Sequence, residues 1–335
     1  MLRLVRELRV IQFKFLSNCT ADDIAAAAAH LISGALVAFP TETVYGLGAD
    51  AANAQAVAKI YDAKGRPSDH PLIVHIASMD VMGDWASAVP KYAIALARNF
   101  WPGPMTLVLK RSGLAGDFVT GGQETVGLRV PDHFVALALL EAFKKLGGTG
   151  IAAPSANRFG HVSPTTAAAV IEELGVYLSK DDLVLDGGAC PVGVESTIID
   201  CTGVVPRVLR PGAISIAMIE NTTELKHQSA EQNEIRVSGS LENHYSPYAN
   251  VILDQIPKPG QGFLALAEIE TPPGVIRLAS PENVSEFARL MYSSLRAADT
   301  QGLAEVVVIQ PLGDEIAIAI RDRLTRASRG FKFEV

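Results

Sequence analysis

Residues 20–40 read TADDIAAAAAHLISGALVAFP, and this stretch sets the pattern that the rest of the chain follows. Thr20 is a suitable helix N-cap, two acids occupy the expected first turn, and Gly34 is a helix stop. A short apolar run then ends at Pro40, as a strand would. The stretch therefore predicts a helix, a tight turn and a buried strand.

The same stretch contains an uncharged run of 18 residues, 24–41, which is just long enough to be considered as a membrane span. The cap, the glycine and the proline argue instead for a helix followed by a strand. The N-terminal residues scatter charges such as Arg3, Arg6 and Glu7 among apolar ones, and so lack the continuous apolar core of a secretory signal. We expect a cytoplasmic protein with no membrane association.

Helical and strand patterns alternate from residue 21 to residue 219, which predicts an α/β fold with a sheet covered by helices. The expected helices are 21–32, 53–63, 91–100, 133–145 and 165–174. The expected strands are 35–40, 71–76, 105–111, 125–130, 150–153, 183–186, 196–201 and 207–210.

A polar segment then interrupts the pattern, because residues 221–246 hold only five aliphatic side chains in 26 positions. We interpret it as a linker too polar to be buried. The alternation resumes beyond Pro247 and predicts a smaller α/β domain. Its expected strands are 251–253, 263–266, 275–278 and 306–309, and its expected helices 282–298 and 315–327. The predicted division is 15–220, 221–247 and 248–335.

Composition limits the functional classes. The chain has 335 residues, 48% apolar and 19% charged, which is typical of globular domains. Its 29 basic and 36 acidic residues give a net charge of −7, so we expect no general nucleic-acid binding. Cys19, Cys190 and Cys201 form no CxxC pair, and the spacing predicts neither a disulfide framework nor a metal site.

Two common nucleotide-binding patterns do not explain the sequence. Residues 46–51, GLGADA, match GxGxxA, but they follow Pro40 by several residues and no ribose-binding acid ends the next strand. We interpret them as an ordinary glycine turn. The sequence contains neither the phosphate-binding GxxxxGK[ST] loop nor the GxSxG elbow of hydrolases.

Short polar motifs instead follow several expected strands, where α/β proteins bind ligands. Residues 40–48, PTETVYGLG, are either a capped turn or a ligand-binding loop. Residues 64–67, KGRP, either cap a helix or hold a phosphate, since Lys64 is a mobile charge and Arg66 a bidentate donor.

Two charged or titratable residues lie inside apolar strands. His75 in LIVHI is more typical of a core position than of a ligand contact. Arg129 in VGLRV needs an anion, which is either a ligand or a buried carboxylate partner.

Further hydroxyls and arginines follow in residues 154–157 (PSAN), 163–165 (SPT), 195–200 (ESTIID) and 208–212 (VLRPG). The SPT motif begins a helix, where an anion fits as well as a simple N-cap.

Taken in order, PTETVYGLG, KGRP with PLIVH, GLRVP, PSAN with SPT, ESTIID and VLRPG resemble the motifs of the threonylcarbamoyl-AMP synthase family. Residues 244–247, HYSP, are similar to a His-Tyr-Ala-Pro motif in its long, two-domain members, with Ser246 in place of alanine. The resemblance implies a YrdC-like twisted mixed sheet with helices packed on it, followed by a Rossmann-like domain.

The resemblance also implies the reaction. L-Threonine, bicarbonate or CO2, and ATP with Mg2+ give L-threonylcarbamoyl-adenylate and pyrophosphate, and a separate complex uses the adenylate to modify a tRNA adenosine. Positioning of anions and neutralisation of charge would dominate this chemistry.

Residue by residue, the resemblance implies two sets of contacts. The implied threonine contacts are Thr43, His75, Arg129, Ala153 and Ser196. The implied ATP contacts are Arg66, His70, Thr125, Ser155, Ser163, Arg210 and Tyr245, with Lys64 and Arg66 as the catalytic cations. His70 stands where the family more often has asparagine or lysine.

Other readings remain open at this stage. A carbamoyl-adenylate-forming enzyme would use carbamoyl phosphate, but such proteins also carry a zinc segment, for which this chain lacks cysteines. An RNA-binding module would line a basic face with Lys64, Arg66, Arg129, Arg158, Arg207 and Arg210. The C-terminal domain could also be a docking module. We interpret the arginines at the end of its last expected helix, Arg321, Arg323, Arg326 and Arg329, as a solvated face favoured by the helix dipole. For residues 221–247 we predict a lid, in which Tyr245 folds over bound nucleotide and excludes water.

Overall fold

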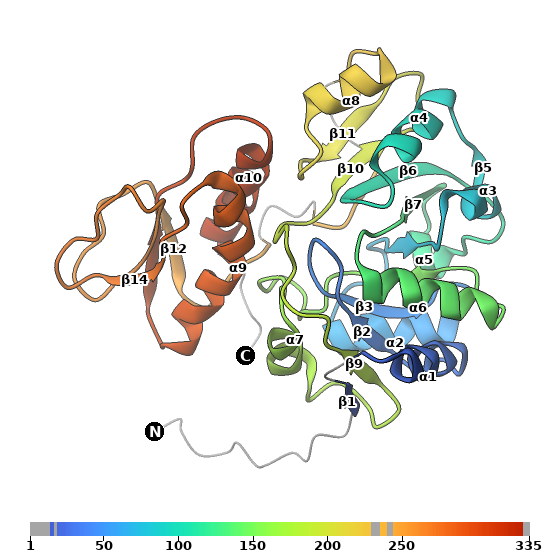
Figure 1. The fold of residues 1–335 in the computed structure, drawn as a ribbon, viewed down its shortest axis with the longest axis horizontal. Helices are drawn as coiled ribbons and strands as arrows, with labels where there is room; N and C mark the ends of the chain where they lie inside the picture. Colours follow the sequence, from blue (N-terminus) through green and yellow to red (C-terminus); the bar gives the residue numbers. More distant parts are fainter. Residues whose placement is uncertain (1–13, 17–18, 229–234, 240–243, 331–335) are drawn as a thin grey trace.

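A computed structural model describes residues 14–16, 19–228, 235–239 and 244–330. Residues up to 223 build the larger of two α/β domains, and the smaller C-terminal domain packs beside it (Figure 1). All the helices and strands expected from the sequence are present, with ends that differ by at most two residues.

The larger domain is organised around a mixed, eleven-stranded sheet of the described residues, in the order β1-β9-β2-β3-β8-β4-β7-β6-β10-β11 with β5 beside β6. Its strands are β1 (Lys14–Leu16), β2 (Val37–Phe39), β3 (Gly46–Asp50), β4 (Ile73–His75), β5 (Ala86–Ala88), β6 (Met105–Arg111), β7 (Thr125–Arg129), β8 (Ile151–Ala152), β9 (Leu183–Leu185), β10 (Thr197–Asp200) and β11 (Arg207–Arg210).

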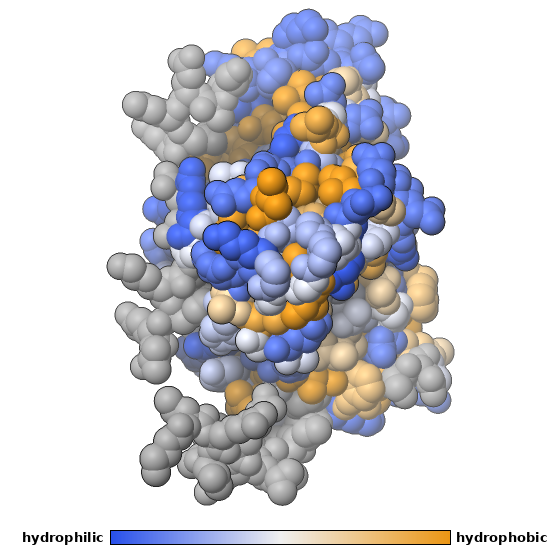
Figure 2. Space-filling view, turned by 90° about the vertical axis from the view of Figure 1, so that its left-hand side faces the viewer, coloured by the Kyte–Doolittle hydropathy of each residue, from blue (hydrophilic) through white to orange (hydrophobic). Residues whose placement is uncertain are grey.

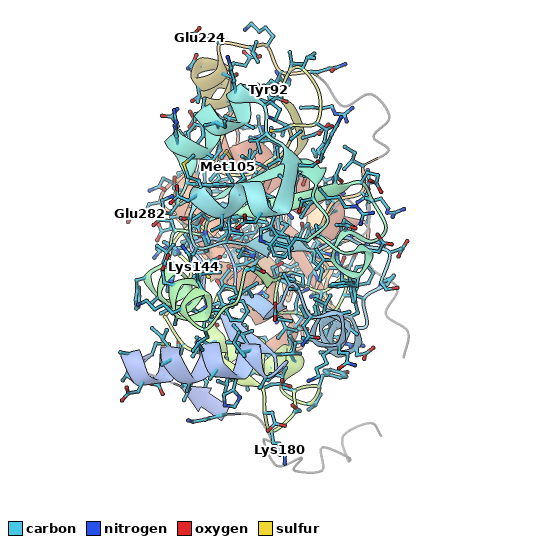
Figure 3. All side chains as sticks on the ribbon, turned by 90° about the vertical axis from the view of Figure 1, so that its right-hand side faces the viewer. Tyr92, Met105, Lys144, Lys180, Glu224 and Glu282 are labelled. Carbon is cyan, nitrogen blue, oxygen red and sulfur yellow. The ribbon has the colours of Figure 1, made fainter. Side chains whose placement is uncertain are left out.

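Helices cover this sheet and bury an apolar core beneath them. They are α1 (Ala21–Ile32), α2 (Ala54–Lys64), the 3-10 turn η1 (Met79–Val81), α3 (Met82–Trp85), α4 (Lys91–Phe100), α5 (Asp117–Thr120), α6 (Phe134–Lys145), α7 (Ala167–Leu174) and α8 (Ile216–Thr223). Thr20 caps α1 as expected, in a reciprocal capping box with Asp23. At the far end of the domain α8 lies against α4, and the Tyr92 hydroxyl donates to the Gly203 carbonyl at 2.9 Å (Figure 3).

The glycine-rich residues 46–51 are not the turn that the sequence suggested, because Gly46–Asp50 form strand β3, antiparallel to β2 and β8. The glycines are needed for close packing. A Cβ on Gly48 would lie 2.8 Å from side-chain atoms of both Ile151 and Phe39. Tight contact between neighbouring strands of the sheet, and not phosphate binding, explains the spacing of these glycines.

The C-terminal domain is Rossmann-like, as the sequence predicted. Its four strands are all parallel, in the order β12-β15-β13-β14. They are β12 (Asn250–Leu253), β13 (Gly262–Leu264), β14 (Ile276–Ala279) and β15 (Glu305–Val308), and the helices are α9 (Val284–Thr300) and α10 (Ile316–Ser328). The outer side of the molecule, where this domain lies, mixes polar side chains with apolar patches (Figure 2).

The expectation that residues 221–247 are too polar to be buried is wrong for positions 237, 239 and 244–247, which are buried, whereas residues 221–228 are exposed or only partly buried. Val237 packs with Val108 and Ile198, and Tyr245 is only 1% exposed. The described part of the segment contacts both domains, because Val237 packs on the larger domain and the Tyr245 ring stacks on Tyr292 of the C-terminal domain. Residues 229–234 and 240–243 lie outside the described residues.

None of the helices described in the structure is long and apolar enough to cross a membrane. The uncharged run 24–41 is divided between α1, a turn, and β2.

Candidate active site

Loops at the ends of β2, β4, β7, β10 and β11 meet the polar segment around a pocket of about 540 Å³. Three guanidinium groups line it, those of Arg66, Arg129 and Arg210, and each of these residues is at most 7% exposed. The pocket is therefore a buried cationic site, suited to anions.

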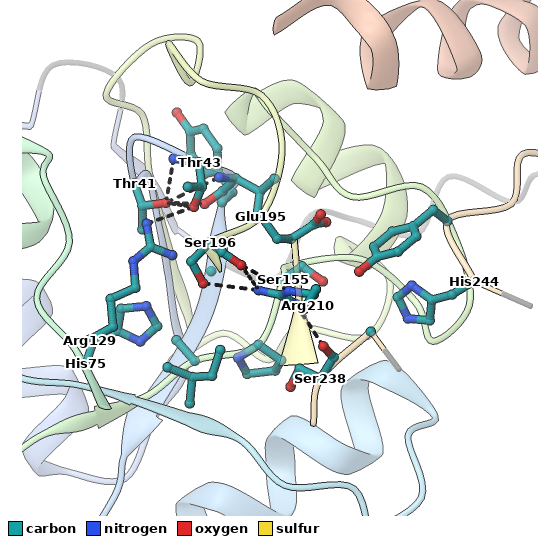
Figure 4. Close-up of a pocket in the computed structure, with 18 of the residues that line it drawn as sticks. Thr41, Thr43, His75, Arg129, Ser155, Glu195, Ser196, Arg210, Ser238 and His244 are labelled. Atoms are coloured by element: carbon teal, nitrogen blue, oxygen red, sulfur yellow. Dashed lines mark hydrogen bonds between the residues drawn. The ribbon is translucent and has the colours of Figure 1, made fainter. Parts of the chain in front are cut away.

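One side of the pocket gathers all five residues implied as threonine contacts, namely Thr43, His75, Arg129, Ala153 and Ser196. The parallel pairing of β4 with β7 places His75 directly beside Arg129 (Figure 4). The pairing of these adjacent strands thus brings together two residues that are 54 positions apart in the sequence.

Arg129 has a carboxylate partner within the chain and still faces the pocket. Its Nη2 forms an ion pair with Glu42 Oε1 at 2.7 Å and donates to Thr43 Oγ1 at 2.9 Å. Its Nε is buried and has no hydrogen-bond partner among the described residues. The two readings of the sequence, a buried ion pair and an anion receptor, are therefore compatible.

His75 is neutral in this environment. Burial, followed by the nearby charge of Arg129, lowers its pKa to about 3. Its Nδ1 is buried without a hydrogen-bond partner among the described residues. A neutral imidazole beside a guanidinium adds a hydrogen-bonding group without adding charge.

The loop that carries Thr43 is held by a turn of the kind that the motif suggested. Thr41 Oγ1 donates to the Val44 carbonyl at 2.7 Å and accepts from the Thr43 amide at 3.1 Å. Thr41 itself lines the pocket, so the capped turn and the ligand-facing loop are the same structure.

The other side of the pocket contains Arg66, Ser155, Arg210 and Tyr245, four of the implied ATP contacts. Arg210 is fixed by its neighbours, since its Nε and Nη2 donate to the Ser196 carbonyl at 3.1 and 3.0 Å and its Nη1 donates to the Ser238 carbonyl at 2.8 Å (Figure 4). Arg66 is held more loosely, through Nη2 to the Pro71 carbonyl at 3.0 Å.

Four implied residues do not line this pocket. Ser163 is buried behind it, where its hydroxyl donates to Glu195 Oε1 at 2.6 Å. Thr125 borders a separate, smaller hollow of about 300 Å³. His70 is partly exposed and lies edge-on to the Phe159 ring, with 5.3 Å between the ring centroids.

Lys64, the fourth of these residues, is buried and donates from Nζ to the carbonyls of Ser155 and Asn157. Burial lowers the pKa of its amine well below the usual value. Both carbonyls belong to the loop that carries Ser155 into the pocket. The described contacts therefore give Lys64 a supporting position behind the loop, and its role as a catalytic cation stays a prediction.

Several pocket residues carried no assigned role in the sequence analysis, among them Thr41, Glu195, Ser238 and His244. Glu195 and His244 stand beside assigned residues in the quoted motifs, so position within the motif was an available signal. Ser238 lies in the polar segment, where no local pattern distinguishes it from its neighbours.

The described residues hold no cluster of three or more His, Cys, Asp or Glu side chains that could bind a metal ion. The carboxylate among the described pocket residues is that of Glu195, and protein donors surround it.

The fold and the pocket define a two-domain α/β protein with a buried, cationic site suited to anions. Residues 29–212 match the family model described as Telomere recombination, that of Sua5, YciO and YrdC, and residues 214–329 match the model described as Threonylcarbamoyl-AMP synthase, C-terminal domain. This chain belongs to the threonylcarbamoyl-AMP synthase family.

Individual relatives support this assignment along most of the chain. Threonylcarbamoyl-AMP synthase of Pyrococcus abyssi is 39% identical over 90% of this chain and 93% of its own length. The synthase of Bacillus subtilis is 38% identical over 92% of this chain and 93% of its own length. The crystal structure of P. abyssi Sua5 complexed with L-threonine matches with a TM-score of 0.84 at 35% identity, and the match covers 95% of this chain and 97% of that one.

Proposed function

We propose that this chain makes L-threonylcarbamoyl-AMP and pyrophosphate from L-threonine, bicarbonate or CO2, and ATP. The observation that carries the proposal is the single pocket in which Arg66, Arg129 and Arg210 are buried together. We assign the lining around Arg129 to the carboxylate of the amino acid and the lining around Arg66 and Arg210 to the triphosphate of ATP. Family membership supplies the chemical identity of the substrates.

In the proposed mechanism threonine binds first through its carboxylate, which meets the free Nε edge of Arg129. Thr43, Ser196 and the neutral His75 surround its hydroxyl and amine. The ammonium group loses one proton to water, its nitrogen forms an N–C bond with CO2 while one C=O π bond becomes the C–O− bond, and the nitrogen then loses a second proton to water, which leaves the carbamate anion. A pocket without a free carboxylate favours this anion.

A carbamate oxygen then attacks the α-phosphorus of ATP. A new P–O bond forms as the bond to the bridging oxygen breaks, and pyrophosphate leaves. Arg66 and Arg210 neutralise the charge that accumulates on the phosphates, and this neutralisation, together with alignment of the two anions, supplies most of the catalysis. No residue of the chain forms a covalent intermediate in this scheme.

Mg2+ enters the proposal as the counter-ion of ATP. The Glu195 carboxylate already accepts from Ser163, Tyr292 and Arg323, so the pocket does not offer it as a magnesium ligand. The phosphate oxygens and water would then hold the ion, which is a common arrangement for Mg2+. When bound, it would neutralise phosphate charge.

The RNA-binding alternative is weakened by burial. Lys64, Arg66, Arg129 and Arg210 were four of the six cations expected to form a basic face, and all four are at most 7% exposed. Buried cations cannot follow a phosphate backbone along a surface. We propose instead that the product passes to a separate tRNA-modifying complex, and that the reaction takes place in the cytoplasm.

The test is incubation of the purified protein with ATP, Mg2+, bicarbonate and L-threonine, followed by mass identification of the adenylate and measurement of pyrophosphate. We expect the adenylate only when threonine is present. A carbamoyl-adenylate formed from carbamoyl phosphate without threonine would overturn the proposal in favour of the other enzyme class. Binding of RNA with a steep loss of affinity at high salt would favour the RNA-binding module.

A further inference from the structure

The Glu195 carboxylate lies in the pocket wall and is held from the C-terminal domain. The residue is 6% exposed and immediately precedes Ser196. Tyr292 donates its hydroxyl to Glu195 Oε2 at 2.9 Å, and Arg323 donates Nε to the same oxygen at 2.8 Å. Ser163 donates to the other oxygen, Oε1, at 2.6 Å.

Tyr292 on α9 and Arg323 on α10 are fully buried, yet their polar atoms reach across to the larger domain. Arg323 also donates Nη2 to the Pro211 carbonyl at 2.9 Å, next to Arg210. Its guanidinium lies 5.3 Å from the centroid of the Tyr245 ring, which stacks on Tyr292. The C-terminal domain thus contacts three parts of the pocket wall.

Glu195 stays ionised in this setting. Burial by itself would raise its pKa, but the charges of Arg323 and Arg210 and the hydrogen bonds from Arg323 and Ser163 lower it to about 2. The carboxylate is therefore a fixed negative charge between one arginine of each domain. It accepts from the Ser163 hydroxyl and directly precedes Ser196, whose carbonyl accepts from Arg210 just before strand β10 begins.

We propose that Tyr292 and Arg323 of the C-terminal domain are positioning residues of the active site, acting through the Glu195 carboxylate on Ser163 and Arg210. The proposal rests on the proposed function, because only that function places Arg210 on ATP; a contact of Ser163 with ATP is implied by the family resemblance alone. It gives the second domain a part in ATP binding without placing any of its side chains on the substrates.

The test uses Tyr292→Phe and Arg323→Met in the full-length protein. Each variant removes a hydrogen bond to a charged group, so we expect the KM for ATP to rise about tenfold. The affinity for L-threonine alone, measured by calorimetry, should change by much less than the KM for ATP, since Arg129, the proposed carboxylate receptor, is untouched and only Ser196 among the threonine contacts neighbours Glu195. Tyr292→Phe keeps the packed ring, which preserves the test if Arg323→Met does not fold.

Arg296→Met is the matched control. Arg296 also lies on α9 and also crosses the domain boundary, with Nη1 on Glu173 Oε1 at 3.0 Å and Nη2 on the Val162 carbonyl. None of these three residues lines the pocket, and the contact with Val162 is to its main chain and not to the Ser163 hydroxyl. This variant should lower the melting temperature and leave the KM for ATP within about twofold of wild type.

Equal effects of Arg296→Met and Arg323→Met on the KM for ATP would overturn the inference, because both arginines would then be simple tethers between domains. An unchanged KM for ATP in folded Tyr292→Phe and Arg323→Met would overturn it as well. Wild-type protein is assayed first. A wild type that makes no adenylate refutes the proposed function, and the inference falls with it.

Discussion

Arg129→Met separates the two roles that the structure gives to this arginine. The substitution removes both the ion pair with Glu42 and the proposed receptor for the threonine carboxylate. The Glu42 side chain is only 5% exposed, and without Arg129 its remaining donor is the Asp132 amide at 3.0 Å. A buried carboxylate that loses its partner costs about 3 to 5 kcal/mol, so the free energy of unfolding should fall by that amount.

The effect on threonine is predicted separately. Loss of a charge-assisted hydrogen bond to the carboxylate, worth about 1.5 to 3 kcal/mol, should weaken threonine binding by roughly 10- to 150-fold. Urea unfolding measures the first effect and calorimetric titration with L-threonine the second. Both measurements use the same protein preparation, and the binding titration is made without urea.

A double variant, Glu42→Gln with Arg129→Met, distinguishes stability from binding. It leaves no unpaired buried charge, so most of the lost stability should return. Threonine binding should remain weak, because the receptor is still absent. Wild-type affinity in the double variant would refute the assignment of Arg129 to the carboxylate and leave it as a purely structural partner of Glu42.

Four further outcomes are expected. Arg66→Ala should reduce the rate of adenylate formation by roughly a hundredfold, because about 2 to 4 kcal/mol of transition-state stabilisation is lost. Circular dichroism should show an intact fold. Normal kinetics in the folded variant would contradict the assignment of Arg66 to the ATP phosphates. In competing-substrate kinetics, valine should be turned over at least about a hundredfold less efficiently than threonine. Serine lacks only a methyl group and should lose about 1 kcal/mol of transition-state stabilisation relative to threonine. Equal use of valine and threonine would mean that the pocket is misassigned. The free energy of unfolding should decline as the pH falls from about 6.5 towards 3. Burial lowers the pKa values of His75 and His244 to about 3, so the unfolded chain binds more protons than the folded chain in this window. Urea midpoints at pH 7 and about 4.5 measure the decline, which should be smaller when both histidines are replaced by glutamine. Tyr245→Ala should weaken ATP binding or increase hydrolysis of the adenylate, and ATP should slow protease cleavage within residues 221–247; wild-type kinetics together with unchanged cleavage would leave this segment a passive tether.

The elements of the fold could be predicted because the signals for them are local. Alternation of apolar runs with capped helical patterns located each expected helix and strand to within two residues. Strand β3 was missed because its glycines resemble a turn when read along the chain. Their reason is the approach of Phe39 and Ile151 from neighbouring strands, which depends on sheet order and not on neighbouring sequence.

The site was predictable to the extent that family motifs mark it. Thr43, His75, Arg129, Ala153 and Ser196 meet in one pocket as the resemblance implied. Lys64 shows the limit of such transfer. A lysine in a phosphate-clamp motif and a lysine that binds two loop carbonyls have the same sequence signature, and only the burial of its amine distinguishes them.

Pairings between distant residues were beyond the reach of sequence patterns. Glu195 and Arg323 are 128 positions apart, and Arg323 lies in a helix whose arginines were interpreted as a solvated face. That interpretation is wrong for Arg323, which is fully buried. A helix that packs against another domain can bury a cation when the carboxylate partner comes from that domain.

The balance of charge within the pocket explains why its three arginines are not equivalent. Glu42 compensates Arg129, and Glu195 lies close enough to Arg210 to affect its titration. Arg66 forms no ion pair with any carboxylate among the described residues, and its burial lowers its pKa to about 10. A buried cation that lacks a carboxylate partner is the group that gains most from a bound anion. Among the three arginines, Arg66 is therefore the one whose charge ATP phosphates would complete, which is why its removal is expected to affect the reaction more than the fold.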